Sequence, residues 1–226
     1  MYNGLRVSFV IPCYNEEKGI RSVLESPPDV VDEIIVVDNN STDEIAKAAS
    51  EMGAKVVLEK RQGYGAACKR GFMAASGDII TTLDGDGMYP IQELLYLIKT
   101  LEEEGLDFIT VRRKPDRMRN IQREFRYMGV IALNFFIYTL FGIRLLDSQS
   151  GMWVFRRRIL DELNLNSDGW PFSEEIKIEA FTNRRLRARE IDRIYHDKRI
   201  GTSKLNLLHD GFRNLLFLFK KRFGTR

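Results

Sequence analysis

Acidic and polar side chains gather in four short clusters in the first half of the chain, each directly after an apolar run. In one of them, Asp84 and Asp86 are separated by a single glycine. Two carboxylates this close repel each other unless a cation such as Mg²⁺ or Mn²⁺ lies between them. Such an ion, held by one or two carboxylates, completes its shell with water and substrate phosphates. The pair therefore predicts a site for a metal–diphosphate complex. The clusters are Pro12-Cys-Tyr-Asn-Glu16, Asp38-Asn-Asn-Ser41, Arg61-Gln-Gly-Tyr-Gly65 and Asp84-Gly-Asp-Gly87.

Alternating strand and helix signals position these clusters. Apolar runs at 5–11, 33–37, 55–58, 78–83 and 107–111 predict strands, and helical spacing predicts helices at 16–24, 41–52, 66–75 and 91–104. Ser41 and Glu44 are expected to form a capping box at the second helix. This alternation predicts a parallel α/β sheet, whose ligands collect beyond the carboxyl ends of the strands. Alone, each cluster is also compatible with a helix cap or a turn. Together, the clusters predict one shared crevice.

The second half of the chain has a different pattern and charge. Helices are predicted at 118–143, 172–182 and 205–223, and strands at 150–155 and 188–195. The first 111 residues carry 19 acidic against 10 basic residues, whereas the remainder carries 25 basic against 13 acidic. A basic half suits phosphate groups, an anionic membrane surface or nucleic acid. No repeat or linker separates the halves, so we expect a single domain.

Composition and missing motifs exclude several classes of protein. Hydrophobic residues make up 44% of the chain, which is enough to bury a core. Neither G-x-G-x-x-G nor G-x-x-x-x-G-K-[ST] occurs, which disfavours a dinucleotide dehydrogenase and a P-loop hydrolase. Two cysteines and two histidines make neither a disulfide framework nor a zinc site. The N-terminus lacks a signal pattern, and the longest uncharged run, 127–143, is shorter than a spanning helix needs.

The motifs in combination resemble family 2 glycosyltransferases of the GT-A fold. The resemblance rests on the Pro12, Asp38 and Asp84 clusters and on Gly77-Asp78. Asp147-Ser-Gln-Ser-Gly151 and Arg199-Ile-Gly-Thr-Ser-Lys-Leu205 narrow it to enzymes similar to dolichyl-phosphate mannose synthase and its polyprenyl-phosphate relatives. It covers about residues 5–205. It implies a glycosyltransferase domain at 1–204, with a nucleotide-sugar half at 1–111 and an acceptor half at 112–204, followed by an amphipathic basic helix at 205–226.

For the nucleotide sugar, the resemblance implies a pocket lined by the first two clusters. Pro12, Tyr14 and Glu16 would line the nucleoside pocket, and Asp38 would hold the base. The family's Asp-Asp-Gly-Ser turn reads Asp-Asn-Asn-Ser here, so the base contact of the second acid stays open.

The resemblance also identifies the metal site. Asp84, Gly85 and Asp86 match the metal-binding Asp-x-Asp motif, with Asp86 expected to be catalytic. Relatives often carry a glutamine two residues further on, where Met88 stands here. We expect Mg²⁺ or Mn²⁺ as the cofactor, with water or donor phosphate filling the remaining positions.

For the acceptor, the resemblance points to basic residues of the second half. Arg112 or Arg113, and Arg126, lie where relatives grip phosphate, although each is equally compatible with a solvated charge. Arg199 would contribute a guanidinium group, Ser203 a hydroxyl and Lys204 an ammonium group. This combination of donors suits the binding of a diphosphate.

The remaining candidate residues lie in the later motifs. Asp147 and Glu175 match family acids expected near the sugar, and both are candidate catalytic residues together with Lys204. Gln149 is expected to contact the acceptor.

The reaction implied is an inverting transfer from a nucleotide diphosphate sugar to dolichyl or polyprenyl phosphate. A UDP-sugar is favoured as the donor, and GDP-mannose is possible. The attacking phosphate is already ionised near pH 7, so a strong base is less necessary than for a hydroxyl acceptor. The metal, lysine and arginine would offset charge on the leaving diphosphate.

The chain's last segment suggests contact with a membrane. Six apolar residues fall on one helical face with cations around them, a pattern suited to an anionic membrane interface. Residues 128–141 offer a second apolar surface. We expect a peripheral enzyme on the cytoplasmic face of the membrane, while core packing or an oligomer interface is the alternative for this face. The six apolar residues are Leu208, Phe212, Leu215, Leu216, Phe219 and Phe223.

Other functions stay open at this point. The same fold transfers sugars to glycan hydroxyls, which would require a base such as Asp147. A non-enzymatic basic domain that binds RNA or a membrane is a further alternative. However, no RNA-recognition motif occurs, and paired carboxylates oppose nucleic acid, so we expect no nucleic-acid partner. The particular sugar, the lipid length and the oligomeric state are left open by the sequence.

Overall fold

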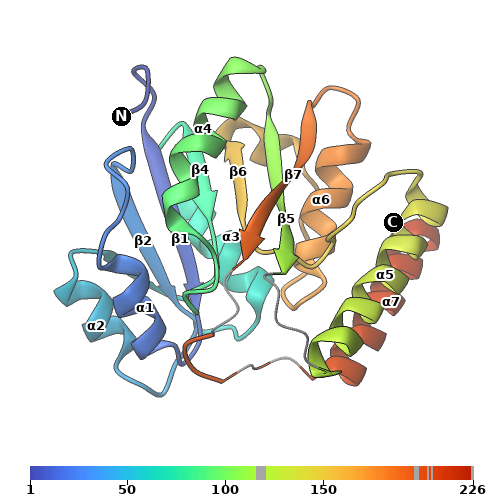
Figure 1. The fold of residues 1–226 in the computed structure, drawn as a ribbon, viewed down its shortest axis with the longest axis horizontal. Helices are drawn as coiled ribbons and strands as arrows, with labels where there is room; N and C mark the ends of the chain where they lie inside the picture. The colour runs from blue at the N-terminus through green and yellow to red at the C-terminus, as the bar shows by residue number, and fades with distance from the viewer. Residues whose placement is uncertain (116–120, 196–198, 203, 205, 225–226) are drawn as a thin grey trace.

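Seven strands form one sheet in the order β3-β2-β1-β4-β6-β5-β7 (Figure 1). The computed structural model describes residues 1–115, 121–195, 199–202, 204 and 206–224, of which 115, 121–126, 194 and 195 are described by their backbone alone. Strand β6 runs antiparallel to β4 and β5, and the other pairings are parallel, which confirms the predicted mostly parallel α/β sheet. The strands are Val7–Cys13 (β1), Glu33–Asp38 (β2), Lys55–Leu58 (β3), Ile79–Thr82 (β4), Phe108–Pro115 (β5), Trp153–Arg156 (β6) and Ala188–Tyr195 (β7).

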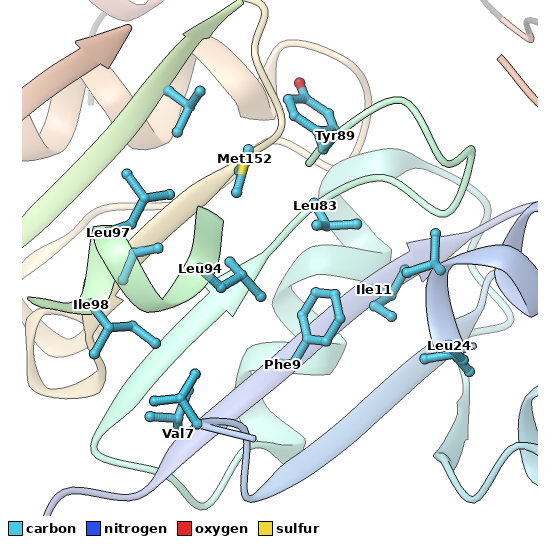
Figure 2. Close-up of a cluster of buried hydrophobic side chains, with 14 of the residues drawn as sticks. Val7, Phe9, Ile11, Leu24, Leu83, Tyr89, Leu94, Leu97, Ile98 and Met152 are labelled. Carbon is cyan, nitrogen blue, oxygen red and sulfur yellow. The ribbon is translucent and has the colours of Figure 1, made fainter. Parts of the chain in front are cut away.

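Helices cover both faces of the sheet because side chains alternate along each strand. Phe9 and Ile11 of β1 pack with the helices α1, α2 and α4, whereas Val10 packs on the other face with α3 and α6. Figure 2 shows Leu94 and Leu97 of α4 in the same cluster as Phe9. The helices are Glu17–Leu24 (α1), Ile45–Glu51 (α2), Tyr64–Ala74 (α3), Leu94–Glu103 (α4), Ile121–Phe141 (α5), Phe172–Thr182 (α6) and Leu207–Phe223 (α7), with 3₁₀ turns at Ile91–Glu93 (η1) and Arg157–Glu162 (η2).

The parallel register brings the polar clusters to one edge of the sheet. Cys13 lies opposite Asp38, and Asp38 lies opposite Leu58. Strand β4 pairs with β1 up to Thr82, so the turn that follows Leu83 emerges at this same edge. The clusters that were expected to share a crevice therefore lie at one edge, at the ends of β1, β2 and β4, and the crevice itself stays a prediction.

The second helix begins later than the sequence predicts. Helix α2 starts at Ile45, and the side chain of its N-cap residue Glu44 makes no capping bond. The Asp43 carboxylate accepts the Ile45 N–H at 3.3 Å. The hydroxyl of Ser41 instead accepts the backbone N–H of Asn15 at 3.0 Å, while the Ser41 N–H donates to Asp38. The capping-box prediction for Ser41 and Glu44 is wrong because Ser41 is used to tie two loops together.

Helices α5 and α7 lie side by side next to α6 (Figure 1). Ile137 of α5 and Leu218 of α7 are fully buried in a small third cluster, to which α6 contributes Ile178. The segment predicted as one or two helices at 118–143 is a single helix from Ile121, and residues 118–120 lie outside the described residues. The final helix is thus packed along α5, and the domain boundary proposed at residue 205 stays a prediction.

Candidate active site

The turn after β4 carries two acids, of which Asp86 is buried and Asp84 is partly exposed. Asp86 is 1% exposed, and its Oδ1 atom accepts the backbone N–H of Met88 at 3.1 Å. Burial and the neighbouring charge of Asp86 raise the pKa of Asp84 to about 6, against the opposing effect of Arg113 and Arg199. The carboxylates of this turn are therefore poorly solvated, which disfavours their charged forms.

Gly85 is required between these acids by the close approach of β1. A Cβ atom added to Gly85 would lie 2.6 Å from the Cys13 sulfur and 3.0 Å from Oε2 of Glu16. The same kind of contact occurs at Gly151, where an added Cβ would lie 2.6 Å from both Asp84 Oδ1 and the Tyr64 hydroxyl. Glycine at these two positions lets three segments of the chain converge on Asp84.

Glu16 and Arg199 complete the charged centre. The Arg199 guanidinium bridges two acids, with Nη2 at 2.7 Å from Glu16 Oε1 and Nη1 at 2.8 Å from Asp86 Oδ2. Burial, together with the charges of Asp84 and Asp86, raises the pKa of Glu16 to about 8. The backbone N–H of Ile200 donates to the Asp86 carbonyl at 3.0 Å, which holds this segment against the turn.

The first two clusters form a tied pair of loops. Pro12 is buried within β1 opposite Val37, and Asp38 Oδ1 accepts the Ser41 N–H at 2.8 Å. Tyr14 is partly exposed, with the Lys204 ammonium 6.0 Å from its ring centroid. The structure therefore places Pro12, Tyr14, Glu16 and Asp38 along the edge where the two loops meet.

Asn39 is a residue of this region that sequence reasoning missed. Its amide nitrogen donates to the carbonyls of Glu59 and Arg61, and its oxygen accepts the Gly63 N–H at 2.8 Å. This side chain is 5% exposed and fixes the 59–63 segment to the end of β2. The second position of the Asp-Asn-Asn-Ser turn thus has a structural task, which an asparagine with both donors and an acceptor can perform.

Asp147 is paired with Arg113. The guanidinium contacts both carboxylate oxygens, at 2.6 and 2.7 Å, and Asp147 is 5% exposed. Burial acts to raise the pKa of Asp147, but Arg113 holds that pKa below its ordinary value. Arg112 faces elsewhere and lies 3.5 Å from Asp192. Of the two arginines considered for phosphate binding, Arg113 belongs to the Asp147 pair and Arg112 to a half-exposed pair.

The loop at 147–151 rests on helix α6 through buried polar groups. Lys177 donates to the carbonyls of Ser148 and Ser150, both at 2.7 Å, and burial lowers its pKa to about 7. Gln149 donates to Glu174 at 2.5 Å and accepts from Asn214 of α7 at 2.9 Å. The structure therefore uses Gln149 to join α6 to α7.

Glu174 and Glu175 are adjacent on α6, and both are buried. Burial raises the pKa of Glu174 to about 8. Glu175 accepts the backbone N–H groups of Asn166 and Ser167, and its other oxygen lies 3.5 Å from Lys221. The sequence-predicted catalytic acid Glu175 is thus engaged by a turn, while its neighbour Glu174, which sequence reasoning missed, contacts the 147–151 loop.

The three remaining residues predicted to bind phosphate, Arg126, Ser203 and Lys204, are described to different extents. Lys204 is exposed and donates to the Thr202 hydroxyl at 3.2 Å. Ser203 lies outside the described residues, and Arg126 is described by its backbone alone, in α5. Lys204 is therefore an exposed cation close to Tyr14.

The family follows from a match that spans most of the chain. The family model "Glycosyl transferase family 2" matches residues 8–164, which include the β1, β2 and β4 ends and the 147–151 loop. The chain belongs to glycosyltransferase family 2. An uncharacterised glycosyltransferase of Mycobacterium tuberculosis is 33% identical over 205 residues, covering 90% of this chain and 91% of that protein.

Two further comparisons bear on the site. The dolichyl-phosphate hexose transferase of Haloferax volcanii is 29% identical over 210 residues, covering 88% of this chain and 86% of that protein. The glucosyl-3-phosphoglycerate synthase of Mycobacterium tuberculosis, solved with Mn²⁺, UDP and phosphoglyceric acid, has a TM-score of 0.78 at 26% identity. That alignment covers 99% of this chain and 80% of the solved one, in agreement with the expected GT-A fold.

The residues of this family 2 site fit a divalent metal ion in part. Asp84 and Asp86 provide hard oxygen ligands in a buried place where their charges repel, which suits Mg²⁺ or Mn²⁺. Among the residues that the structure describes, no group of three or more histidine, cysteine or acidic side chains is arranged to hold a metal alone. A metal ion here would need phosphate oxygens or water to complete its shell.

Proposed function

We propose that this enzyme transfers a sugar, with inversion, from a nucleotide diphosphate sugar to a dolichyl or polyprenyl phosphate. A UDP-sugar is the favoured donor, and GDP-mannose is the second choice. The observation that carries the choice of acceptor is the pairing of Asp147 with Arg113. A hydroxyl acceptor needs a general base with a pKa near the working pH, whereas a carboxylate held by a guanidinium at low pKa is a poor base. A phosphate acceptor is already ionised and needs no such group.

The chain's own residues then divide the work at the diphosphate. Asp84 and Asp86 would hold Mg²⁺ or Mn²⁺, which when bound offsets negative charge on the diphosphate. Arg199 and Lys204 supply further positive charge at the same edge of the sheet, where the leaving group gains charge during transfer. Glu16, Tyr14, Pro12 and Asp38 line the side on which the nucleoside would lie.

The exposed faces of α5 and α7 support contact with a membrane. Helix α7 exposes Leu208 by 88% and Phe223 by 68%, and α5 exposes Met128 by 64%. The two helices lie side by side, and the ring of Phe136 on α5 packs edge-on against Phe219 on α7. We define this α5–α7 face by its exposed residues Tyr127, Met128, Ile131, Phe135, Tyr138, Leu208, Phe212, Leu216, Phe219 and Phe223.

Cations accompany this face, as an anionic membrane interface would require. Arg213, Lys220 and Arg222 are exposed on α7. Among the described residues, none of the helices is both long and apolar enough to cross a membrane. We therefore propose that the α5–α7 face lies in the plane of the interface and brings the active site to a lipid phosphate, on the cytoplasmic side. Leu215, predicted on this face, packs instead against the buried cluster of Leu218.

The test is a panel of radiolabelled nucleotide sugars with Mn²⁺ and polyprenyl phosphate in detergent. Label should move into the organic phase on extraction with at least one donor, and chelator should prevent the transfer. The Asp86→Asn protein serves as the inactive control. Transfer to a water-soluble hydroxyl acceptor, with none to the lipid phosphate, would overturn the proposed acceptor, and full activity in chelator would overturn the metal.

A further inference from the structure

Arg199 holds an unusual position between the two acids it contacts. One nitrogen is 2.7 Å from Glu16 and the other is 2.8 Å from Asp86, so a single guanidinium is shared between two carboxylates on different loops. Asp86 is 1% exposed, whereas the Arg199 side chain is 26% exposed. The positive group therefore reaches from the solvent side down to a buried acid.

The Arg113–Asp147 pair has a different geometry. There the Nε and Nη2 atoms of one guanidinium both donate to the same carboxylate, in the bidentate geometry that fixes the orientation of both side chains. In Arg199 the two contacts are split, and the Nε atom is buried without a partner among the described residues. Arg199 thus keeps one N–H group unused at the place where a diphosphate is expected.

Among the described residues, the acids at this point outnumber the cations in direct contact with them. Glu16, Asp84 and Asp86 come together at the Gly85 turn, where a Cβ atom on Gly85 would lie 3.0 Å from Glu16 Oε2. Arg199 is the cation in direct contact with two of these three acids. A divalent ion bound by Asp86 and a guanidinium on the same carboxylate would repel each other at short range.

We propose that Arg199 is the resident counter-ion of the metal site, and that a divalent cation and the nucleotide enter together by displacing it from Asp86. Asp86 would then be free to hold the ion, and the Arg199 guanidinium would turn its N–H groups to the diphosphate oxygens. Metal alone binds weakly because it must expel Arg199 without offering that group a new partner. This inference rests on the metal and nucleotide use proposed above, but on neither the sugar nor the acceptor.

The experiment measures Mn²⁺ binding by calorimetry, with and without UDP, in wild-type protein and in Arg199→Met. The methionine keeps the length of the side chain and removes its charge. Without UDP, Arg199→Met should bind Mn²⁺ about tenfold more tightly than wild type. The factor by which UDP strengthens Mn²⁺ binding should be smaller in the variant, because the guanidinium that would join the diphosphate is missing.

Two further variants separate this effect from general electrostatics and from misfolding. Arg193→Met removes the same charge from an ion pair with Glu93 and should leave Mn²⁺ binding unchanged. Arg199→Lys keeps the charge but lacks the guanidinium that reaches both acids, so its Mn²⁺ affinity should fall between those of wild type and Arg199→Met. If the methionine variant does not fold, the Mn²⁺ affinity of Arg199→Lys tests the inference in its place.

Equal or weaker Mn²⁺ binding by the folded Arg199 variants in the absence of UDP would overturn the inference. So would an equal gain in affinity in Arg193→Met. The readout contains no lipid and no sugar, so a failure to glycosylate polyprenyl phosphate would count against the proposed function and leave this inference standing.

Discussion

The acids at the β1 and β4 ends and the acids around the 147–151 loop differ in how their charges are balanced. Near that loop, Asp147 has its own guanidinium, and Glu175 has two backbone N–H groups. At the strand ends, Glu16 and Asp86 share the single guanidinium of Arg199, and burial together with the charges of Asp84 and Asp86 raises the pKa of Glu16 to about 8. Glu174 is the exception near the loop, because burial raises its pKa to about 8 as well. We expect the acids with dedicated partners to stabilise the fold and the acids at the strand ends to bind a ligand.

The largest effect that tests this contrast is expected at Asp86. Asp86→Asn keeps the oxygen that accepts the Met88 N–H but removes the charge. Turnover should fall by at least about 10²–10³-fold, the loss typical of removing one electrostatic stabiliser, and nucleotide binding should no longer depend on metal. The midpoint of thermal unfolding should change little, because relief of the repulsion with Asp84 offsets the loss of the ion pair with Arg199. Kinetics and thermal melts on the same preparation check both expectations.

At Arg113, by contrast, we expect a substitution to lower the stability of the fold. Arg113→Met leaves Asp147 buried without its guanidinium, and loss of one partner of a buried pair costs about 3–5 kcal/mol of unfolding free energy. Urea unfolding measures this loss. Arg112→Met is the matched control, since its pair with Asp192 is partly exposed, and it should change stability by under about 1 kcal/mol. Equal stability of the two variants would contradict the distinction drawn between the two acid groups.

The pH dependence of unfolding provides an independent check on this pair. Arg113 lowers the pKa of Asp147 against the effect of burial, so the pair stabilises the folded state above the ordinary pKa of aspartate. That contribution is lost as the pH falls through the lowered pKa of the folded protein. Wild-type stability should therefore decline in acid more steeply than the stability of Arg113→Met.

Much of the strand-end region was predictable from the sequence, because the carboxyl ends of parallel strands must meet at one edge of the sheet. The Asp-Gly-Asp turn follows the buried strand β4, and Pro12 and Asp38 follow the register of β1 and β2. The start of α2 was mispredicted because Ser41 bonds Asn15, a contact across 26 residues that local capping preference does not reveal.

The second half was less predictable because its contacts depend on which face each side chain takes. Arg112 and Arg113 are neighbours on β5, and neighbouring residues of a strand point to opposite faces. The register with β7 sets Arg112 opposite Asp192 and leaves Arg113 for Asp147. Glu174 and Glu175 present the same difficulty on a helix. Their different roles follow from where the 147–151 and 166–167 segments lie, which no local pattern encodes.

A smaller kinetic effect is expected at Lys204, which the structure leaves exposed. Lys204→Ala should lower kcat/KM about tenfold or more, as expected when a charge-assisted contact worth about 1.5–3 kcal/mol is lost. Its thermal stability should equal that of wild type, because the side chain's contact with Thr202 is at the surface. Unchanged kinetics, or a fall in stability that accounts for the loss, would remove Lys204 from the group of phosphate-binding residues.

The smallest effects are expected on the α5–α7 face, where each side chain contributes a small part of the binding. Phe212 and Phe223 are 61% and 68% exposed, whereas Leu218 on the same helix is fully buried. Replacing both phenylalanines with serine should release the protein from vesicles that contain anionic lipid and leave UDP affinity intact, because we expect these exposed rings to contact the membrane and they are not part of the buried core. Leu218→Ser is the matched control and should instead destabilise the fold by about 2–5 kcal/mol, as loss of a buried leucine does.

Salt distinguishes a membrane partner from a second copy of the chain on this face. Each exposed lysine or arginine near an anionic surface contributes on the order of 1 kcal/mol and is screened within a Debye length. Vesicle binding of the wild type should therefore weaken as salt rises, and Lys220→Gln should weaken it further at low salt. A dimer held by the apolar face would respond in the opposite way, because burial of apolar surface persists when charges are screened. Wild-type sedimentation with vesicles that is insensitive to salt, or a dimer that Phe212→Ser and Phe223→Ser dissociate, would show that another copy of the chain, and not lipid, covers these helices.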